Sequence, residues 1–237
     1  MNAGIQISSF RPLMTDAEGL KDVLAHMREI GASYTQLQWI DKSVPARTVA
    51  QLLAVYGIKA CGVQDKAKEI FSDSGYYMEM CLECGCPEIC VSGIPDGDTD
   101  SFAAHMDALS ERAAKHGIQL SYHPVKADIL CGACESFINK RRSVGLVPDT
   151  CQLTDAGRDV CSFILAHKGR IRTVHFKDRN ECGALCPPGS GMTDFAPVVA
   201  ACRQAGVQLL LAEQETWTDA YAELRQGFMH VLSLLSA

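Results

Sequence analysis

Short apolar runs alternate with stretches of helical periodicity along the whole chain. Such runs are typical of strands buried on both faces, and the stretches between them are typical of helices that cover a sheet. The pattern repeats eight times, with strands expected at Gly4–Phe10, Ser33–Gln38, Ile58–Gln64, Glu88–Gly93, Ile118–His123, Val144–Asp149, Ile171–Lys177 and Val207–Glu213. Eight repeated βα units predict a parallel sheet with helices on its outer side.

Capping residues and glycines predict where the helices begin and end. Polar caps precede three of the expected helices, Ala17–Ile30, Phe102–Lys115 and Asp155–His167. Glycines suited to helix ends come shortly before strands at Gly31, Gly57, Gly85, Gly117 and Gly206. Because 237 residues suffice for one closed barrel, we expect the fold class α/β, a single-domain (β/α)8 TIM barrel over residues 1–237.

Composition narrows the class of protein further. The chain is 47% hydrophobic with a net charge of -6, and its basic residues form only short clusters, so we expect no nucleic-acid partner. The first residues do not resemble a signal peptide, and no segment is apolar enough to span a membrane. We therefore expect a cytoplasmic protein without a membrane partner, whose twelve cysteines stay reduced.

Four side chains with metal-ligand chemistry fall at equivalent places in the predicted repeats. His123, Asp149, His175 and Glu213 lie at or near the ends of the fifth, sixth, seventh and eighth strands. Parallel barrel strands deliver their last residues to one rim, so these groups are expected to converge. Two carboxylates and two imidazoles suit a divalent metal ion such as Mn²⁺, Mg²⁺, Co²⁺ or Zn²⁺.

Each of these residues also has a simpler interpretation when it is taken singly. Asp149 could cap the following helix, His175 could be a satisfied core histidine, and the other two could be solvated rim residues. The shared position on four successive strands favours a common site.

The last third of the chain also carries a family resemblance. The segments VGLVPDT, GRIRTVHFKDR, PPGSGMTDFAPVVAACRQAGV and LLLAEQE resemble the sugar phosphate isomerase/epimerase family, the xylose isomerase-like TIM barrels. The resemblance implies a metal-dependent isomerase or epimerase that acts on a small carbohydrate (a sugar, keto-sugar or sugar phosphate) through an enediolate. It also implies that His123, Asp149, His175 and Glu213 bind the metal, and it allows a homo-oligomer.

The same resemblance suggests roles for neighbouring residues. Glu213 is the expected base, His123 is a second proton-transfer candidate and Lys177 would stabilise oxyanion charge. The remaining residues expected to contact substrate or orient the site are Gln64, Gln152, Asp178, Arg179, Glu215, Trp39 and Trp217. Arg179 begins a long loop rich in Gly and Pro, Arg179–Thr193, of the kind that shapes barrel active sites.

Departures from the family pattern leave two alternatives open. Many related epimerases carry a Glu where this chain has His123, so a symmetric epimerisation by two carboxylates is doubtful. The segment Tyr122–Pro124 resembles inosose-dehydratase-like members, which makes a metal-dependent dehydratase or keto-sugar lyase an alternative. Gln64, Val125 and Gln152 stand where relatives carry histidines, which makes a degenerate, non-catalytic sugar-binding barrel the other alternative.

Overall fold

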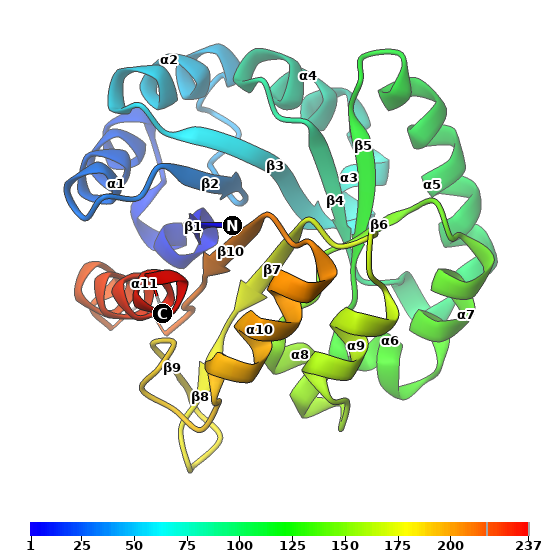
Figure 1. The fold of residues 1–237 in the computed structure, drawn as a ribbon. Coiled ribbons are helices and arrows are strands. Elements are labelled where there is room, and N and C mark those ends of the chain that lie inside the picture. The colour runs from blue at the N-terminus through cyan, green and yellow to red at the C-terminus, as the bar shows by residue number, and fades with distance from the viewer. Residues whose placement is uncertain (217, 237) are drawn as a thin grey trace.

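Eight parallel strands surrounded by helices form a nearly closed barrel (Figure 1) in the computed structural model, which describes residues 1–216 and 218–236. The strands are β1 (Asn2–Gln6), β2 (Tyr34–Leu37), β3 (Lys59–Lys66), β4 (Glu88–Ser92), β5 (Gln119–His123), β6 (Gly145–Leu146), β7 (Thr173–Phe176) and β10 (Leu209–Ala212). They are hydrogen-bonded in the order β6-β5-β4-β3-β2-β1-β10-β7. Isolated parallel bridges from Leu146 to Ile171 and from Asp149 to His175 join the two edges. The predicted fold class, a single-domain (β/α)8 TIM barrel, is therefore confirmed.

The helices cover the outside of the strands. They are α1 (Ala17–Glu29), α2 (Ala46–Tyr56), α3 (Ala67–Ser72), α4 (Ser74–Cys84), α5 (Thr99–Ala114), α6 (Lys126–Leu130), α7 (Ala133–Lys140), α8 (Thr150–Asp155), α9 (Val160–Ala166), α10 (Phe195–Ala205) and α11 (Ala220–Ser236), with 3-10 helices η1 (Ile7–Leu13) and η2 (Pro95–Gly97). Their apolar faces pack on the sheet; in α1 these are Leu20, Val23, Leu24 and Met27. None of the helices described is both long and apolar enough to cross a membrane.

Several predicted boundaries were wrong, and three of them show why. The first strand ends at Gln6, and the chain continues as η1 rather than extending to Phe10. The third expected helix, Asp155–His167, is interrupted because Gly157 adopts a φ of 73°, and Asp159 then caps a separate helix, α9. Helix α5 begins at Thr99, since the carboxylate of Asp98 accepts a hydrogen bond from the backbone N–H of Ser101. The five glycines predicted at helix ends all have positive φ.

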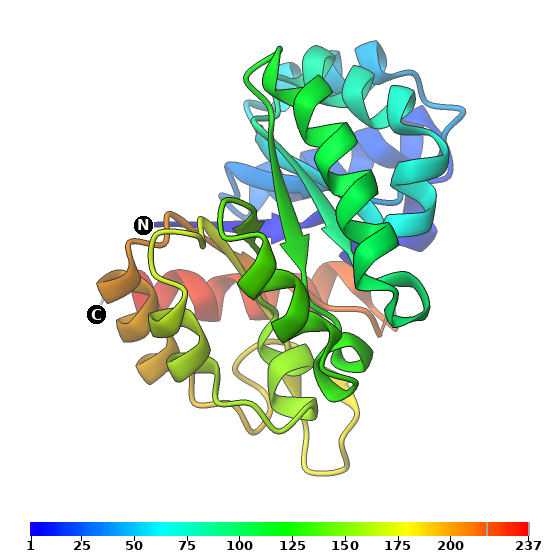
Figure 2. The same ribbon diagram turned by 90° about the vertical axis from the view of Figure 1, so that its right-hand side faces the viewer.

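The long loop after β7 is organised by one buried carboxylate. Asp178, the first residue of the short hairpin strand β8 (Asp178–Arg179), is fully buried, and β9 (Leu185–Cys186) pairs with β8. The Asp178 carboxylate accepts hydrogen bonds from four backbone N–H groups, those of Arg179, Gly189, Gly191 and Thr193. The hairpin, drawn yellow in Figure 2, projects beyond the barrel at the end toward which the green strand β5 points. Asp178 thus fixes the loop at the C-terminal end of the strands.

Candidate metal centre

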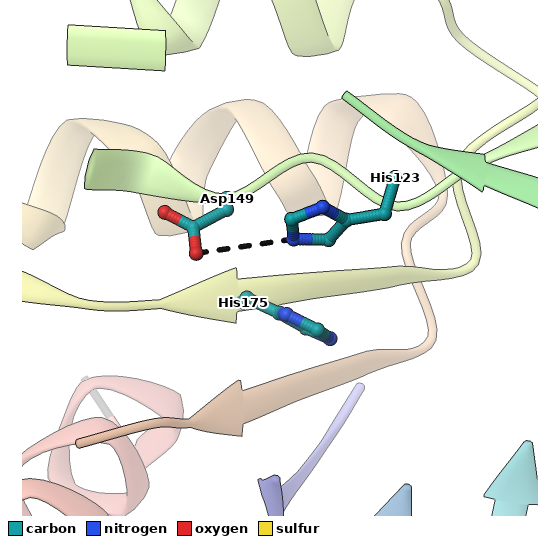
Figure 3. Close-up of side chains that lie close together, drawn as sticks. All are labelled: His123, Asp149 and His175. Carbon is teal, nitrogen blue, oxygen red and sulfur yellow. Dashed lines mark ion pairs between the residues drawn. The ribbon is translucent and has the colours of Figure 1, made fainter. Parts of the chain in front are cut away.

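The C-terminal end of the barrel brings the four predicted metal-ligating residues close together. His123 is the last residue of β5, Asp149 follows β6, His175 lies within β7, and Glu213 follows β10. Ligand atoms of His123, Asp149 and His175 all lie within 4.8 Å of one another (Figure 3). Glu213 joins them through its Oε2, which is 2.9 Å from His175 Nδ1. All four side chains are buried.

Asp149 has a separate role for each carboxylate oxygen. Oδ1 accepts a hydrogen bond of 2.9 Å from the backbone N–H of Gln152 and so caps α8. Oδ2 faces the cluster and lies 3.9 Å from both His123 Nε2 and Lys177 Nζ. The cap therefore holds the carboxylate in place while its second oxygen remains available to a ligand.

Both histidines have a polar partner on the ring nitrogen that faces away from the cluster. His123 Nδ1 is 3.3 Å from Ser92 Oγ, and His175 Nε2 is 2.8 Å from the side-chain oxygen of Gln36. If these nitrogens carry the ring protons, His123 Nε2 and His175 Nδ1 present lone pairs to the cluster. Metal-binding histidines in proteins commonly have such partners.

Lys177 lies among the carboxylates of the site. Its ammonium is 3.4 Å from Glu213 Oε1 and 3.9 Å from Asp149 Oδ2, and it also pairs with Glu215. Three carboxylates thus surround one ammonium in a buried region, which leaves an excess of two negative charges when all are ionised. Burying negative charge in this way destabilises the folded state unless a cation balances it.

The surroundings shift the pKa values of the clustered groups in different directions. Burial, and then the neighbouring His175, lower the pKa of His123 to about 3, so this imidazole is neutral at pH 7. Burial raises the pKa of Asp149 to about 6, although Lys177 opposes the shift. Burial alone would raise the pKa of Glu213, but Lys177 and His175 outweigh it and the pKa is lowered. Burial alone would lower the pKa of Lys177, but the carboxylates outweigh it and the pKa is raised.

The residues present fit a divalent cation. His175 Nδ1 and Glu213 Oε2 face each other at 2.9 Å, and neither of these buried atoms has a hydrogen bond to any other described residue. Two nitrogen and two carboxylate donors form a set that first-row divalent metals accept. Together with the excess negative charge, these two buried donor atoms, which have only each other as partners, make the cluster a candidate metal centre.

The predicted substrate-contacting residues are placed in different surroundings. Glu215 joins the site through Lys177, and Gln64 is buried on β3 with its Oε1 free of hydrogen bonds to the described chain. Gln152 accepts a hydrogen bond of 2.7 Å from the backbone N–H of Lys126. The Asp178 carboxylate is used by loop N–H groups, and Arg179 pairs with Asp155. Their proposed contacts with substrate stay predictions.

The two tryptophans complete the predicted set. Trp39 lies beyond β2 with a φ of 56°, and its Nε1 donates a hydrogen bond of 3.3 Å to Asp65. The guanidinium of Arg11 lies over its ring, 4.5 Å from the centroid. Positive φ is strained for a bulky residue, and such strain is common near functional sites. Trp217 lies outside the described residues.

Sequence reasoning missed the polar residues that support the histidines. Gln6 on β1, Gln36 on β2 and Ser92 on β4 were not singled out. Polar residues inside otherwise apolar strands were the available signal, because a strand buried in a barrel seldom carries a carboxamide without a partner.

A large cavity lies at the other end of the barrel. It has a volume of about 690 Å³ and is lined at the N-terminal ends of the strands by residues that include Asn2, Tyr34, Glu88 and Arg172. None of the clustered residues, His123, Asp149, His175, Lys177 or Glu213, lines it. Cavity size alone therefore does not mark the candidate metal centre.

Comparison with known proteins gives a family match over most of the chain. The family described as "Xylose isomerase-like TIM barrel" matches residues 24–232. Among curated proteins, the inosose dehydratase of Lacticaseibacillus casei is 25% identical over 145 residues, which cover 51% of this chain and 49% of that protein. The match thus spans about half the length of this relative.

Solved structures share the fold across nearly the whole chain. A sugar phosphate isomerase/epimerase from Parabacteroides distasonis ATCC 8503 has a TM-score of 0.79 at 14% identity and covers 98% of this chain and 93% of its own. An L-ribulose 3-epimerase has a TM-score of 0.78 at 18% identity, covering 99% and 94% respectively. At these identities the likeness concerns the fold.

Proposed function

The chain belongs to the xylose isomerase-like TIM barrel family, and on that premise we propose that it is a metal-dependent isomerase or epimerase of a small carbohydrate. One observation carries the proposal: buried His123, Asp149, His175 and Glu213 converge at the C-terminal end of the barrel around Lys177. Catalytic groups of such barrels lie at this end. Solved structures with the same fold include a sugar phosphate isomerase/epimerase and an L-ribulose 3-epimerase.

His123, Asp149, His175 and Glu213 are the residues that would hold a divalent metal. The metal would polarise the carbonyl and neighbouring hydroxyl of a keto-sugar and so ease formation of an enediolate. Its identity among Mn²⁺, Mg²⁺, Co²⁺ and Zn²⁺ is open, because the mixed donor set suits all four.

The chain's own residues would move the proton and stabilise charge. Glu213 would accept the carbon-bound proton, and Lys177, whose Nζ is 3.4 Å from Glu213 Oε1, would stabilise the developing oxyanion through its ammonium. His123 is neutral at pH 7, because burial holds its pKa at about 3, so it has a free lone pair when Ser92 accepts its other ring proton. Glu215 neutralises part of the Lys177 charge and orients its side chain.

A dehydratase is the second candidate. The curated relative is an inosose dehydratase, and this chain presents His123 where an epimerase would use a second carboxylate. A dehydratase starts from the same removal of a proton beside a carbonyl but then expels a hydroxyl group. The two reactions therefore differ in the fate of water and share the site.

Proton exchange separates the two reactions. We would incubate the protein with MnCl₂ and either L-ribulose or an inosose in D₂O, and follow each sugar by NMR and mass spectrometry. An isomerase or epimerase places deuterium on carbon in a product of unchanged composition, whereas a dehydratase yields a product that has lost one water.

Matched variants connect either outcome to the site. Asp149→Asn keeps an oxygen that can accept the hydrogen bond from the backbone N–H of Gln152 but removes the charge. We expect this variant to abolish turnover. Glu88→Gln alters a carboxyl group at the opposite end of the barrel and should leave turnover unchanged. Equal turnover by wild type and Asp149→Asn would contradict the proposed site.

A further inference from the structure

One buried hydroxyl fixes the backbone of Lys177 to the first turn of α8. Thr150 is the first residue of α8 and is only 1% exposed. Its Oγ donates a hydrogen bond of 2.6 Å to the carbonyl oxygen of Lys177 and accepts one of 2.9 Å from the backbone N–H of the same lysine. The direction of both bonds is fixed, because a backbone N–H can only donate and a carbonyl oxygen can only accept.

The Thr150 hydroxyl holds the chain at the point where a barrel strand ends. β7 ends at Phe176, which is paired with Ala212 of β10, and Lys177 is the next residue. Lys177 is buried, so its backbone groups need partners within the protein, and Thr150 supplies a partner for both of them. Because the hydroxyl binds on both sides of the Lys177 Cα, it restricts the backbone torsion angles from which the lysine side chain starts.

The turn that carries Thr150 is itself held in place. Asp149 Oδ1 accepts a hydrogen bond of 2.9 Å from the backbone N–H of Gln152, and Gln152 Oε1 accepts one of 2.7 Å from the backbone N–H of Lys126 at the start of α6. Thr150 lies within this turn and directly follows Asp149. The turn therefore sets the position of the Asp149 carboxylate and of the Lys177 backbone together.

The position of the Lys177 backbone matters because of where its ammonium lies. Nζ is 3.4 Å from Glu213 Oε1 and 3.9 Å from Asp149 Oδ2. A lysine side chain is a flexible stem of four carbons, so its ammonium can occupy many positions unless the chain that carries it is fixed. The Thr150 hydroxyl thus narrows the positions open to the one cation among these carboxylates in the described part of the chain.

We propose that Thr150 is a positioning residue for the reaction, because its hydroxyl holds the Lys177 backbone so that the ammonium stays between Asp149 and Glu213. This inference rests on the role of Lys177 in the proposed function, which is to stabilise the developing oxyanion. Thr150 acts only through Lys177. A displacement of about 1 Å in a catalytic group can lower a rate by about 100-fold, so the loss of the hydroxyl should be visible in turnover.

A matched set of variants separates this role from a structural one. Thr150→Val keeps the branched shape but removes the hydroxyl, and Thr150→Ser keeps the hydroxyl. Thr35 is also fully buried, and its hydroxyl donates a hydrogen bond of 2.8 Å to the carbonyl oxygen of Ile5, which joins β2 to β1. Thr35→Val therefore removes a buried hydrogen bond that does not involve Lys177. Thermal unfolding confirms that each variant is folded.

The first experiment locates the Lys177 ammonium without any need for turnover. Crystal structures of the full chain are compared for wild type, Thr150→Val, Thr150→Ser and Thr35→Val. We expect Lys177 Nζ to leave its place between Asp149 and Glu213, or to occupy more than one position, in Thr150→Val alone.

The second experiment measures kcat and KM in MnCl₂ with whichever of L-ribulose and the inosose wild type converts. Thr150→Val should lower kcat by about 10- to 100-fold with KM nearly unchanged, because the oxyanion develops only in the transition state. Thr150→Ser should recover most of this loss, and Thr35→Val should keep the wild-type kcat.

The inference is overturned if Thr150→Val leaves Nζ in its wild-type position with the wild-type kcat. Equal losses of kcat in Thr150→Val and Thr150→Ser would also overturn it, because the hydroxyl would then not be the cause. Failure of the proposed function has a different signature, namely no conversion of either sugar by wild type. The crystal structures still decide in that case, since displacement of Nζ in Thr150→Val but not in Thr35→Val supports positioning by Thr150.

Discussion

Buried carboxylates form ion pairs at one end of the barrel and not at the other. At the C-terminal end, Asp149, Glu213 and Glu215 all approach the Lys177 ammonium within ion-pair distance. At the N-terminal end, Glu88 is only 6% exposed and lines the cavity of about 690 Å³, but takes part in none of the ion pairs formed by the described residues. Burial raises the pKa of Glu88, although Ser121 and Arg172 oppose the shift.

This difference shows what identifies a site in a barrel. A buried carboxylate occurs at both ends, and the cavity of about 690 Å³ is at the end without clustered ligands. Within residues 1–216 and 218–236, only the C-terminal end combines imidazoles, carboxylates and an ammonium from different strands within a few ångströms. Convergence of complementary groups, rather than burial or cavity size, therefore distinguishes the candidate metal centre.

Removing the cation of the C-terminal end should have the largest effect on stability. In metal-free protein, Lys177→Met leaves buried carboxylates without their ammonium, and we expect the free energy of unfolding to fall by about 3–5 kcal/mol. Added MnCl₂ should restore part of the loss, because the metal replaces the missing charge. Urea unfolding with and without MnCl₂ measures both effects.

Lys59→Met is the matched control at the N-terminal end. Lys59 is exposed beside Tyr34 in the lining of the cavity, so the same substitution should change stability by no more than about 0.5 kcal/mol. Similar losses for the two variants would remove the contrast between the ends.

His123 should make stability depend on pH. Its folded pKa of about 3 lies below the ordinary 6.5, so the folded state binds fewer protons than the unfolded state between these values. Wild type should therefore lose about 2 kcal/mol between pH 7.5 and pH 5 relative to His123→Gln, which has no titrating ring. Urea unfolding in EDTA at both pH values gives the difference. Parallel pH profiles for the two proteins would show that His123 is not held neutral by the fold.

Glu88→Gln should have a smaller effect than the protonation of His123, and in the opposite direction. A carboxyl group whose folded pKa is raised stabilises the fold below its unfolded pKa, and that contribution is lost as pH rises. The neutral Gln should thus make the protein more stable than wild type at pH 8, within about 1 kcal/mol, with the difference disappearing near pH 4. A loss of stability at pH 8 would mean that the Glu88 carboxylate has a stabilising partner in this cavity.

The local sequence pattern was sufficient to predict the strands and the convergence of the candidate metal ligands at the strand ends. Alternation of strand and helix located all eight barrel strands. The expectation that barrel strands end at one rim correctly brought together His123, Asp149 and His175. Helix breaks were harder, because a single Gly157 with positive φ divided a segment whose apolar pattern was continuous. The pattern of apolar positions carries no information about the backbone torsion angle of a single glycine.

Hydrogen bonds and ion pairs that depend on side-chain direction could not be predicted from the sequence. Asp178 is one example: its oxygens accept hydrogen bonds from backbone N–H groups of a loop whose path no local signal predicts, while its expected contact with substrate stays a prediction. The contact of Gln36 with His175 joins residues 139 positions apart and follows only from closure of the barrel. The placement of Lys177 among three carboxylates depends likewise on rotamers.

The most direct test of the central claim is the position of a bound metal. Crystals grown with MnCl₂ should give one strong anomalous peak per chain at the manganese edge, between His123, Asp149, His175 and Glu213, and Asp149→Asn should lose it. A peak at Glu88 in the N-terminal cavity instead, or no peak at either end, would contradict a metal centre at the C-terminal end of this barrel.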